Sequence, residues 1–179
     1  MKIINIRGKS GAGKTTISYE LAKELKGYVF VDIWKIKEMF EPLNLKNRKP
    51  QNKICKDAVF QIIKYTLKEN LSNNFILQES RVSTIKKYLK NYLSNKDKIY
   101  SFYLDVDLEN TLKRNITREK RTMSKKHFIE QAKNSFPKKD REDIIIDTGK
   151  KTKKQVVDVI LREIGVKRSS KKIKIRKCI

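Results

Sequence analysis

The stretch "GKSGAGKTT" at residues 8–16 decides the fold, because it matches the pattern GxxxxGK[ST] through Gly8, Gly13, Lys14 and Thr15. It follows the apolar run "KIINIR" and precedes the amphipathic run "TISYELAKELK", so it joins an expected strand to an expected helix. Glycine permits backbone conformations that other residues avoid, and successive N–H groups can then converge on phosphate oxygens. The positive end of the helix adds to this attraction. The stretch therefore predicts a phosphate-binding loop, or P-loop, that holds a nucleotide.

Individual residues of the loop have separate expected tasks. Lys14 is expected to reach the β- and γ-phosphates of the nucleotide, and the Thr15 hydroxyl is expected to ligate Mg²⁺. The remaining phosphate contacts are expected from Gly8, Ser10, Gly11, Ala12, Gly13 and Thr16. The loop therefore predicts a nucleotide and Mg²⁺ as ligands.

Short apolar runs alternate with amphipathic stretches along the whole chain. The expected strands cover residues 3–6, 28–31, 75–77, 99–104 and 144–146. The expected helices cover residues 15–26, roughly 52–70, 83–93, 108–118, 124–133 and 152–164. Apolar strands between helices indicate a parallel sheet that is covered on both faces. We therefore expect a doubly wound α/β fold with a parallel sheet of about five strands.

The chain has 179 residues, which suits one domain. We expect residues 1–165 to form this domain, with a basic lid at about 118–141 and a basic tail at 166–179. The stretch 41–52 carries two prolines and few core residues, so we expect a mobile surface loop there.

The charge of the chain is strongly positive, with 44 Lys and Arg against 20 Asp and Glu, a net charge of +24. AT-rich coding would explain the abundance of Lys, Asn and Ile, but such drift would raise Glu as well. The imbalance therefore favours a polyanionic partner, and nucleic acid is the first candidate.

The chain shows no sign of a membrane or secreted location. No apolar stretch approaches the roughly 20 residues that span a bilayer. A strand is expected almost at the first residue, so we expect no signal peptide. Cys55 and Cys178 lack metal-site spacing and are expected to be reduced thiols. These features predict a cytoplasmic protein.

P-loops occur in motors, switches and phosphotransferases, and two other stretches help to separate these classes. The third expected strand ends "NFILQES", without the terminal Asp that a motor ATPase uses to hold metal-bound water. The stretch "NKDK" at 95–98 lacks the spacing of a guanine-binding motif, and it precedes a strand instead of following one. Both observations argue against a motor and a GTPase.

A kinase requires an acid for the acceptor's proton and cations over the transferred phosphate. Asp32 ends the second expected strand, "GYVFVD", where α/β folds present active-site groups, and Lys35 follows one helical turn later. Asp32 can also cap a helix that begins at Ile33, and the two roles are compatible.

Three arginines follow the fourth expected strand at spacings of four and three. They are Arg114, Arg118 and Arg121, and on a continuing helix they share one face. Such a row can close over phosphates, whereas the alternative is a solvated basic helix end.

At these residues the chain resembles P-loop kinases that phosphorylate hydroxyl groups. The resemblance extends to adenylylsulfate kinases and gluconate-type kinases, and it is closest to the kinase domain of phage-type polynucleotide kinases. "GKSGAGKTT", Asp32-x-x-Lys35 and "LDVDLENTLKRNITREKR" carry the resemblance. It implies ATP as the phosphate donor, Asp32 as the general base for a 5′-hydroxyl and Lys35 as a contact to the acceptor. It also implies that Arg118 stabilises the transferring phosphoryl group.

The chain departs from this family at two places in the acceptor half of the site. Lys35 stands where the family has Arg, which removes a bidentate donor. "QESRVS" stands where the family has an Asp after the third strand. We expect Glu79 to substitute for that Asp, with Ser80 and Arg81 lining the acceptor channel.

A few further residues have two open interpretations. Trp34 stacks on a nucleobase or packs its helix, and "DTGK" at 147–150 contacts adenine or forms a plain turn. Asp105 and Asp107 help to hold the metal or begin the next helix, and His127 is expected on the surface.

We therefore expect an ATP-dependent, Mg²⁺-requiring kinase that phosphorylates a hydroxyl of RNA or DNA, with the 5′-hydroxyl favoured. One alternative is a P-loop kinase for a small metabolite or nucleotide, with a charge that reflects drift. A second alternative is an RNA-binding P-loop module without kinase activity. Oligomeric state has no signature in the sequence.

Overall fold

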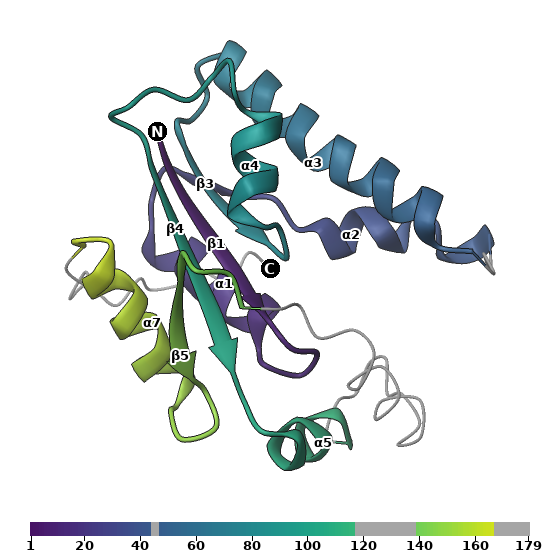
Figure 1. Cartoon of the computed structure of the whole chain (residues 1–179), viewed down its shortest axis with the longest axis vertical. Helices are drawn as coiled ribbons and strands as arrows, with labels where there is room; N and C mark the ends of the chain where they lie inside the picture. The colour runs from purple at the N-terminus through teal and green to yellow at the C-terminus, as the bar shows by residue number, and fades with distance from the viewer. Residues whose placement is uncertain (44–46, 117–138, 167–179) are drawn as a thin grey trace, which may run out of the picture.

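A five-stranded parallel sheet forms the centre of the computed structural model, which describes residues 1–43, 47–116 and 139–166 (Figure 1). The strands are β1 (Lys2–Gly8), β2 (Tyr28–Phe30), β3 (Asn74–Gln78), β4 (Lys98–Asp105) and β5 (Asp143–Asp147). Their order in the sheet is β2-β3-β1-β4-β5, and every neighbouring pair is parallel. The expected fold class and the strand positions are confirmed.

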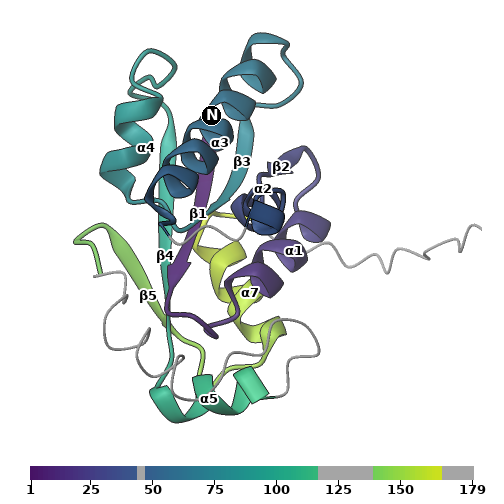
Figure 2. The same cartoon turned by 90° about the vertical axis from the view of Figure 1, so that its right-hand side faces the viewer.

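Helices cover both faces of the sheet (Figures 1 and 2). They are α1 (Lys14–Glu24), α2 (Ile33–Glu38), α3 (Lys49–Lys68), α4 (Val82–Tyr88), α5 (Leu108–Ile116) and α7 (Lys153–Glu163), with a short 3₁₀ helix η1 (Glu41–Leu43). α1 and α7 pack on one face, whereas α3 and α4 pack on the other. α5 lies beyond the C-terminal end of β4, next to the loop that follows β1 (Figure 1).

Successive side chains of β1 enter two separate hydrophobic cores. Ile4 and Ile6 face α1 and α7, whereas Ile3 faces α3 and α4, and all three side chains are fully buried. This follows from the two-residue period of a strand. Burial of each isoleucine side chain contributes about 1.5–3 kcal/mol to the free energy of unfolding. Because both faces are covered, the strand reads in the sequence as a continuous apolar run.

Polar side chains replace apolar ones toward the C-terminal end of β1. Arg7 is 1% exposed and its guanidinium forms ion pairs with Asp140, at 2.9 Å, and with Asp143. The Asn5 amide donates to the Ser80 carbonyl oxygen at 2.7 Å. A buried charge needs such partners, because desolvation is otherwise costly. These contacts tie the end of β1 to β5 and to the segment after β3, and so they fix the base of the P-loop.

The expected surface loop at 41–52 is shorter than the sequence indicated. η1 occupies part of it, and α3 begins at Lys49 instead of near residue 52. Pro50 lies in the first turn of α3, where the missing N–H of proline has no intrahelical partner to lose. The proline that was interpreted as a loop residue is thus part of a helix start.

The helix expected at 83–93 is also shorter, since α4 ends at Tyr88. A turn follows, in which the Tyr92 N–H donates to the Leu89 carbonyl oxygen at 2.8 Å. The helix expected at 124–133, most of the lid expected at 118–141 and nearly all of the tail expected at 166–179 lie outside the described residues. The division into a domain, a lid and a tail stays a prediction.

In the described part of the chain, no helix combines the length and the apolar character that crossing a membrane requires.

Candidate nucleotide and phosphoryl-transfer site

The P-loop connects β1 to α1 and depends on glycine at three positions. Gly8, Gly11 and Gly13 have positive φ angles of 139°, 81° and 92°. A Cβ atom on Gly8 would lie 2.4 Å from the carbonyl oxygen of Leu104 in β4. A Cβ atom on Gly11 would lie 3.2 Å from Cβ of Thr111 in α5. Both the backbone angles and the close approach of neighbouring elements therefore select glycine.

The Lys14 side chain folds back over the loop. Its ammonium donates to the carbonyl oxygens of Gly8 and Lys9, at 2.9 Å each, and lies 3.3 Å from a carboxylate oxygen of Glu79. The side chain is only 8% exposed. The loop carbonyls hold the positive charge beside the N-terminus of α1, where phosphates are attracted. This position suits a contact to the β- and γ-phosphates.

Two oxygen atoms suited to a magnesium ion lie near each other at the start of α1. The Thr15 hydroxyl is 3.5 Å from the side-chain oxygen of Gln78, the last residue of β3. The Gln78 side chain is 2% exposed, and its amide nitrogen has no hydrogen-bond partner among the described residues. Mg²⁺ usually takes few protein ligands and completes its shell with waters and substrate phosphates. These residues therefore fit the ion.

Asp32 lies at the N-terminus of α2, just after β2. One carboxylate oxygen, Oδ1, accepts the Trp34 N–H at 2.9 Å, so Asp32 caps the helix as expected. The other oxygen, Oδ2, lies 3.3 Å from the Tyr19 hydroxyl of α1. The cap uses only one of the two oxygens, so Oδ2 can also accept a proton.

The side chains that follow Asp32 in α2 take different positions. Trp34 packs against the core under α3, with the Lys37 ammonium 4.3 Å from its ring centre, as the packing interpretation predicts. Lys35 is exposed, and the hydrogen bond with the Tyr19 hydroxyl raises the pKa of Lys35 above its ordinary value. Nearby carboxylates, including Asp32, act in the same direction. Lys35 is thus a fully charged cation next to Asp32.

The segment after β3 contains the other residues expected in the acceptor half. Glu79 has a φ angle of 61°, in the left-handed region that non-glycine residues rarely adopt. Its carboxylate contacts Lys14, as described above. Ser80 is 6% exposed, and its carbonyl oxygen is bound by Asn5. Arg81 is exposed at the start of α4. Strained backbone of this kind is commonly found at functional sites.

Arg114 joins three elements around the P-loop. Its guanidinium donates to the Thr148 carbonyl oxygen at 2.6 Å and to the Gly11 carbonyl oxygen at 3.5 Å. The Thr148 hydroxyl lies 3.4 Å from the Ala12 carbonyl oxygen. α5, the P-loop and the "DTGK" turn are therefore held together. Within that turn, the Gly149 N–H donates to the Asp147 carboxylate at 2.8 Å.

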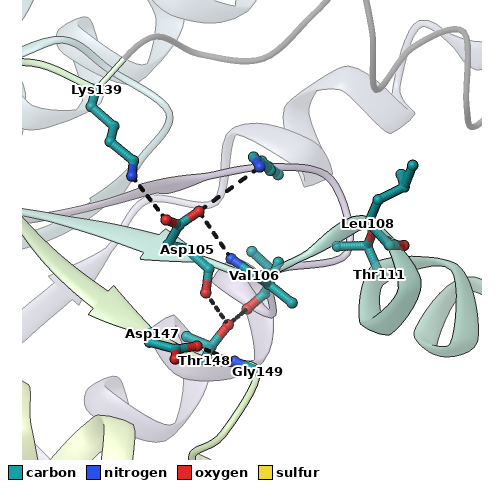
Figure 3. A network of polar contacts seen from close by, with 10 residues as sticks. Asp105, Val106, Leu108, Thr111, Lys139, Asp147, Thr148 and Gly149 are labelled. Carbon is teal, nitrogen blue, oxygen red and sulfur yellow. Dashed lines mark hydrogen bonds and ion pairs between the residues drawn. The ribbon is translucent and has the colours of Figure 1, made fainter.

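Asp105 lies at the end of β4 between two basic side chains (Figure 3). Lys139 donates to its carboxylate at 2.8 Å, and Lys9 of the P-loop lies 3.9 Å from the other oxygen. The hydrogen bond from Lys139 lowers the pKa of Asp105 below its ordinary value, although partial burial opposes the shift. The backbone oxygen of Asp105 accepts the Thr148 N–H at 2.7 Å.

Asp107 serves the start of α5, since its carboxylate accepts the Asn110 N–H at 2.7 Å. This matches the structural interpretation of that residue. Among the described residues, no group of three or more His, Cys, Asp and Glu side chains is arranged to hold a metal ion. Arg118, Arg121 and His127 lie outside the described residues.

Tyr19 and Gln78 were not identified from the sequence. Tyr19 follows Thr15 by four residues, so both project from the same side of α1. Gln78 ends β3, and the ends of parallel strands are where α/β folds present functional groups. Both positions were therefore accessible to sequence reasoning, but neither residue type is a usual signal for phosphoryl transfer.

The sheet order and the loop between β1 and α1 define a P-loop nucleotide-binding fold. A model of the family described as shikimate kinase matches residues 10–165, and the chain belongs to this family. The expected class of kinase is confirmed, and ATP, generally with Mg²⁺, is the donor that this class uses. The expected closeness to polynucleotide kinases stays a prediction. A search of curated proteins found no match.

Several solved structures share the fold of this chain. A sugar kinase from Janibacter sp. is 16% identical over 93% of this chain and 95% of that chain, with a TM-score of 0.66. A gluconokinase from Sinorhizobium meliloti is 15% identical over 90% of each chain, with a TM-score of 0.61. A chain of the Pnkp1/Rnl/Hen1 RNA repair complex is 17% identical over 99% of this chain and 51% of that chain, with a TM-score of 0.57. At these identities the similarities show the fold.

Proposed function

We propose that this protein transfers the γ-phosphoryl group of ATP to a hydroxyl group, with Asp32 as the general base. The observation that carries the proposal is the carboxylate of Asp32 at the end of β2, one oxygen of which is left by the helix cap to accept a proton. Residues 1–165 form the kinase domain in this proposal.

The transfer itself requires one bond to form and one to break. The acceptor oxygen forms a bond to the γ-phosphorus, the bond from the γ-phosphorus to the β–γ bridging oxygen breaks, and ADP leaves. The acceptor's proton passes to Oδ2 of Asp32. Lys14 balances the charge of the β- and γ-phosphates, since its ammonium already lies at the loop carbonyls.

Further residues support the donor side of this reaction. Mg²⁺ would be held by Thr15, with Gln78 close by, and it would neutralise charge on the phosphate oxygens. Arg114 keeps the P-loop and the "DTGK" turn in register through its two carbonyl contacts. Arg118 and Arg121 are proposed to approach the transferred group, as the sequence indicates.

We propose a small polyhydroxylated molecule as the acceptor. The match of residues 10–165 to the shikimate kinase family supports this class, and the sugar kinase and gluconokinase folds agree with it. Asp32 and Glu79 are carboxylates that can accept hydrogen bonds from several hydroxyl groups. Lys35 and Arg81 are exposed cations that can bind an anionic group on the same molecule.

A polynucleotide hydroxyl is the second candidate acceptor, and charge favours it. Residues 33–68, between β2 and β3, contain nine Lys and Arg against three Asp and Glu. The fold similarity to a chain of an RNA repair complex also supports this candidate. Binding to a polyanion releases counterions, so this candidate predicts an affinity that falls steeply with salt.

The test offers γ-labelled ATP with shikimate, gluconate and a panel of sugars, and separately with a 5′-hydroxyl oligonucleotide of RNA or DNA. Label on a small molecule, with none on the oligonucleotide, is the expected result. Label on the oligonucleotide alone would contradict the small-molecule acceptor and support the polynucleotide hydroxyl. Absence of transfer to any acceptor, with ATP binding intact, would favour an RNA-binding module without kinase activity and contradict the proposal.

A further inference from the structure

Tyr19 links the P-loop helix to the end of β2. Its ring packs edge-on against Phe30, with 5.0 Å between ring centres and an interplanar angle of 84°. Its hydroxyl lies 3.3 Å from Oδ2 of Asp32. The side chain is 36% exposed, so the core does not require tyrosine at this position. The hydroxyl contact therefore needs an explanation other than packing.

The Lys35 ammonium lies over the ring of the same tyrosine. It lies 5.7 Å from the centre of the Tyr19 ring, and its interaction with the tyrosine side chain raises the pKa of Lys35. An ammonium can only donate, so Lys35 does not compete for the hydroxyl proton, which points toward Oδ2 of Asp32. The tyrosine side chain therefore lies next to both the Lys35 ammonium and the Asp32 carboxylate.

The two oxygens of Asp32 are thereby held by different elements. Oδ1 accepts the Trp34 N–H of α2 at 2.9 Å, and Oδ2 faces the Tyr19 hydroxyl of α1 at 3.3 Å. Two donors on two oxygens fix the plane of the carboxylate. A carboxylate oxygen has two acceptor positions, so Oδ2 can bind the tyrosine hydroxyl and still receive a proton from an acceptor molecule.

We propose that Tyr19 is a positioning residue for phosphoryl transfer: it holds Oδ2 of Asp32 in the orientation that takes the acceptor's proton. Lys35 acts on Asp32 through the same hydroxyl, in addition to any contact with the acceptor. This inference rests on the proposed role of Asp32 as the general base. It assigns a function to a helix residue that lies outside the GxxxxGK[ST] pattern.

The test compares Tyr19→Phe with wild type, using shikimate, gluconate or the oligonucleotide, whichever the wild-type protein phosphorylates. The variant keeps the ring against Phe30 and removes only the hydroxyl. We expect kcat to fall about tenfold, as for the loss of one hydrogen bond to a charged group, with the KM for ATP and the thermal midpoint unchanged. Tyr92→Phe, at a residue that is 44% exposed in the turn before β4, is the matched control and should behave as wild type.

A double variant tests whether Lys35 acts through the hydroxyl. We expect Lys35→Met to lower kcat in the wild-type background and to have no further effect on kcat in the Tyr19→Phe background. Independent, multiplicative losses would overturn the part of the proposal that concerns Lys35.

Asp32→Asn, measured beside these variants, separates the possible failures. If Asp32→Asn is inactive but Tyr19→Phe retains full kcat, Tyr19 has no positioning role and the proposed function stands. If Asp32→Asn retains full kcat, the proposed base is wrong and the role of Tyr19 is overturned with it. A joint loss of thermal stability and ATP binding in Tyr19→Phe would show a structural role instead. A wild-type protein that phosphorylates none of the acceptors would overturn both proposals.

Discussion

The donor half and the proposed acceptor half of the site are built in different ways. The donor half, from Gly8 to Thr15, is shaped by backbone atoms. Its Lys14 side chain is 8% exposed and is held by loop carbonyls. The proposed acceptor half consists of side chains from α1, α2 and the segment after β3, and several of them, including Lys35 and Arg81, are exposed. Backbone geometry is required for any triphosphate, whereas exposed side chains can be exchanged to suit an acceptor. The difference explains why the class of enzyme is easier to establish than its acceptor.

The largest expected effect concerns the backbone of the donor half. Gly8→Ala would bring a Cβ atom to 2.4 Å from the Leu104 carbonyl oxygen, at a φ angle of 139°. The sheet has to shift at the base of the P-loop, so we expect a loss of at least about 3 kcal/mol in the free energy of unfolding and no measurable ATP binding. Urea denaturation and ATP titration measure the two quantities.

Gly27→Ala is the matched control for this change. Gly27 also has a positive φ angle, of 81°, but a Cβ atom there meets nothing within 4 Å. Its cost should be limited to about 1–2 kcal/mol for the left-handed conformation. Equal losses in the two variants would contradict the claim that close approach of β4 shapes the loop.

The second effect concerns the link between the P-loop and the "DTGK" turn. Arg114→Met removes the guanidinium contacts to Gly11 and to Thr148. Because hydrogen bonds from a charged donor are worth about 1.5–3 kcal/mol, we expect ATP to bind at least about tenfold more weakly. Calorimetric titration with ATP measures the change. Wild-type affinity in Arg114→Met would show that the turn holds its position without the arginine.

The third effect is a gain in ATP affinity, in contrast to the two losses above. It concerns Glu79, which lies between the two halves of the site. Glu79→Gln removes a negative charge 3.3 Å from the Lys14 ammonium, so this ion pair no longer has to be broken when phosphate binds. We expect ATP to bind about two- to fivefold more tightly, in line with a partly exposed ion pair. The same titration applies, with Glu142→Gln, in the Glu142–Lys86 surface ion pair, as the control. Weaker ATP binding would assign Glu79 to the donor half instead.

The smallest effect is a pH dependence of stability. The pKa of Asp105 is lowered in the folded protein by Lys139, so its ionised form contributes stability above the ordinary value of 3.8, and this contribution is lost as the pH falls through the lowered pKa. Asp105→Asn should therefore melt slightly below wild type at pH 7 and together with it in strong acid. Thermal melts across this range measure the difference. A difference in melting temperature that grows as the pH falls would contradict a stabilising role for the ionised Asp105 carboxylate.

The parts of the molecule that the sequence predicts well are those with a local cause. The P-loop glycines are needed by their own backbone angles, and the apolar runs of β1 and β4 need burial wherever they occur in the chain. The sequence predicts a start of α3 near residue 52, later than the observed start at Lys49, because Pro50 suits both a loop and the first turn of a helix. Local pattern alone does not separate the two.

The acceptor half has causes that are distant along the chain. The Tyr19 side chain contacts Asp32 and lies near Lys35, which follow it by 13 and 16 residues, and the strand order brings them together. Glu79 contacts Lys14 across 65 residues, and its positive φ angle is not predictable from its residue type. Such contacts depend on packing between elements, which single-sequence patterns do not encode.

The most direct test of the account measures ATP affinity and phosphoryl transfer in the same preparation of Asp32→Asn. Asparagine also caps helices well, so α2 should keep its start while the proton acceptor is lost. We predict a Kd for ATP within about twofold of wild type and a transfer rate lower by at least about a hundredfold, the usual contribution of a general base. Transfer at the wild-type rate, or parallel loss of ATP binding and transfer, would contradict the assignment of Asp32 to the acceptor half.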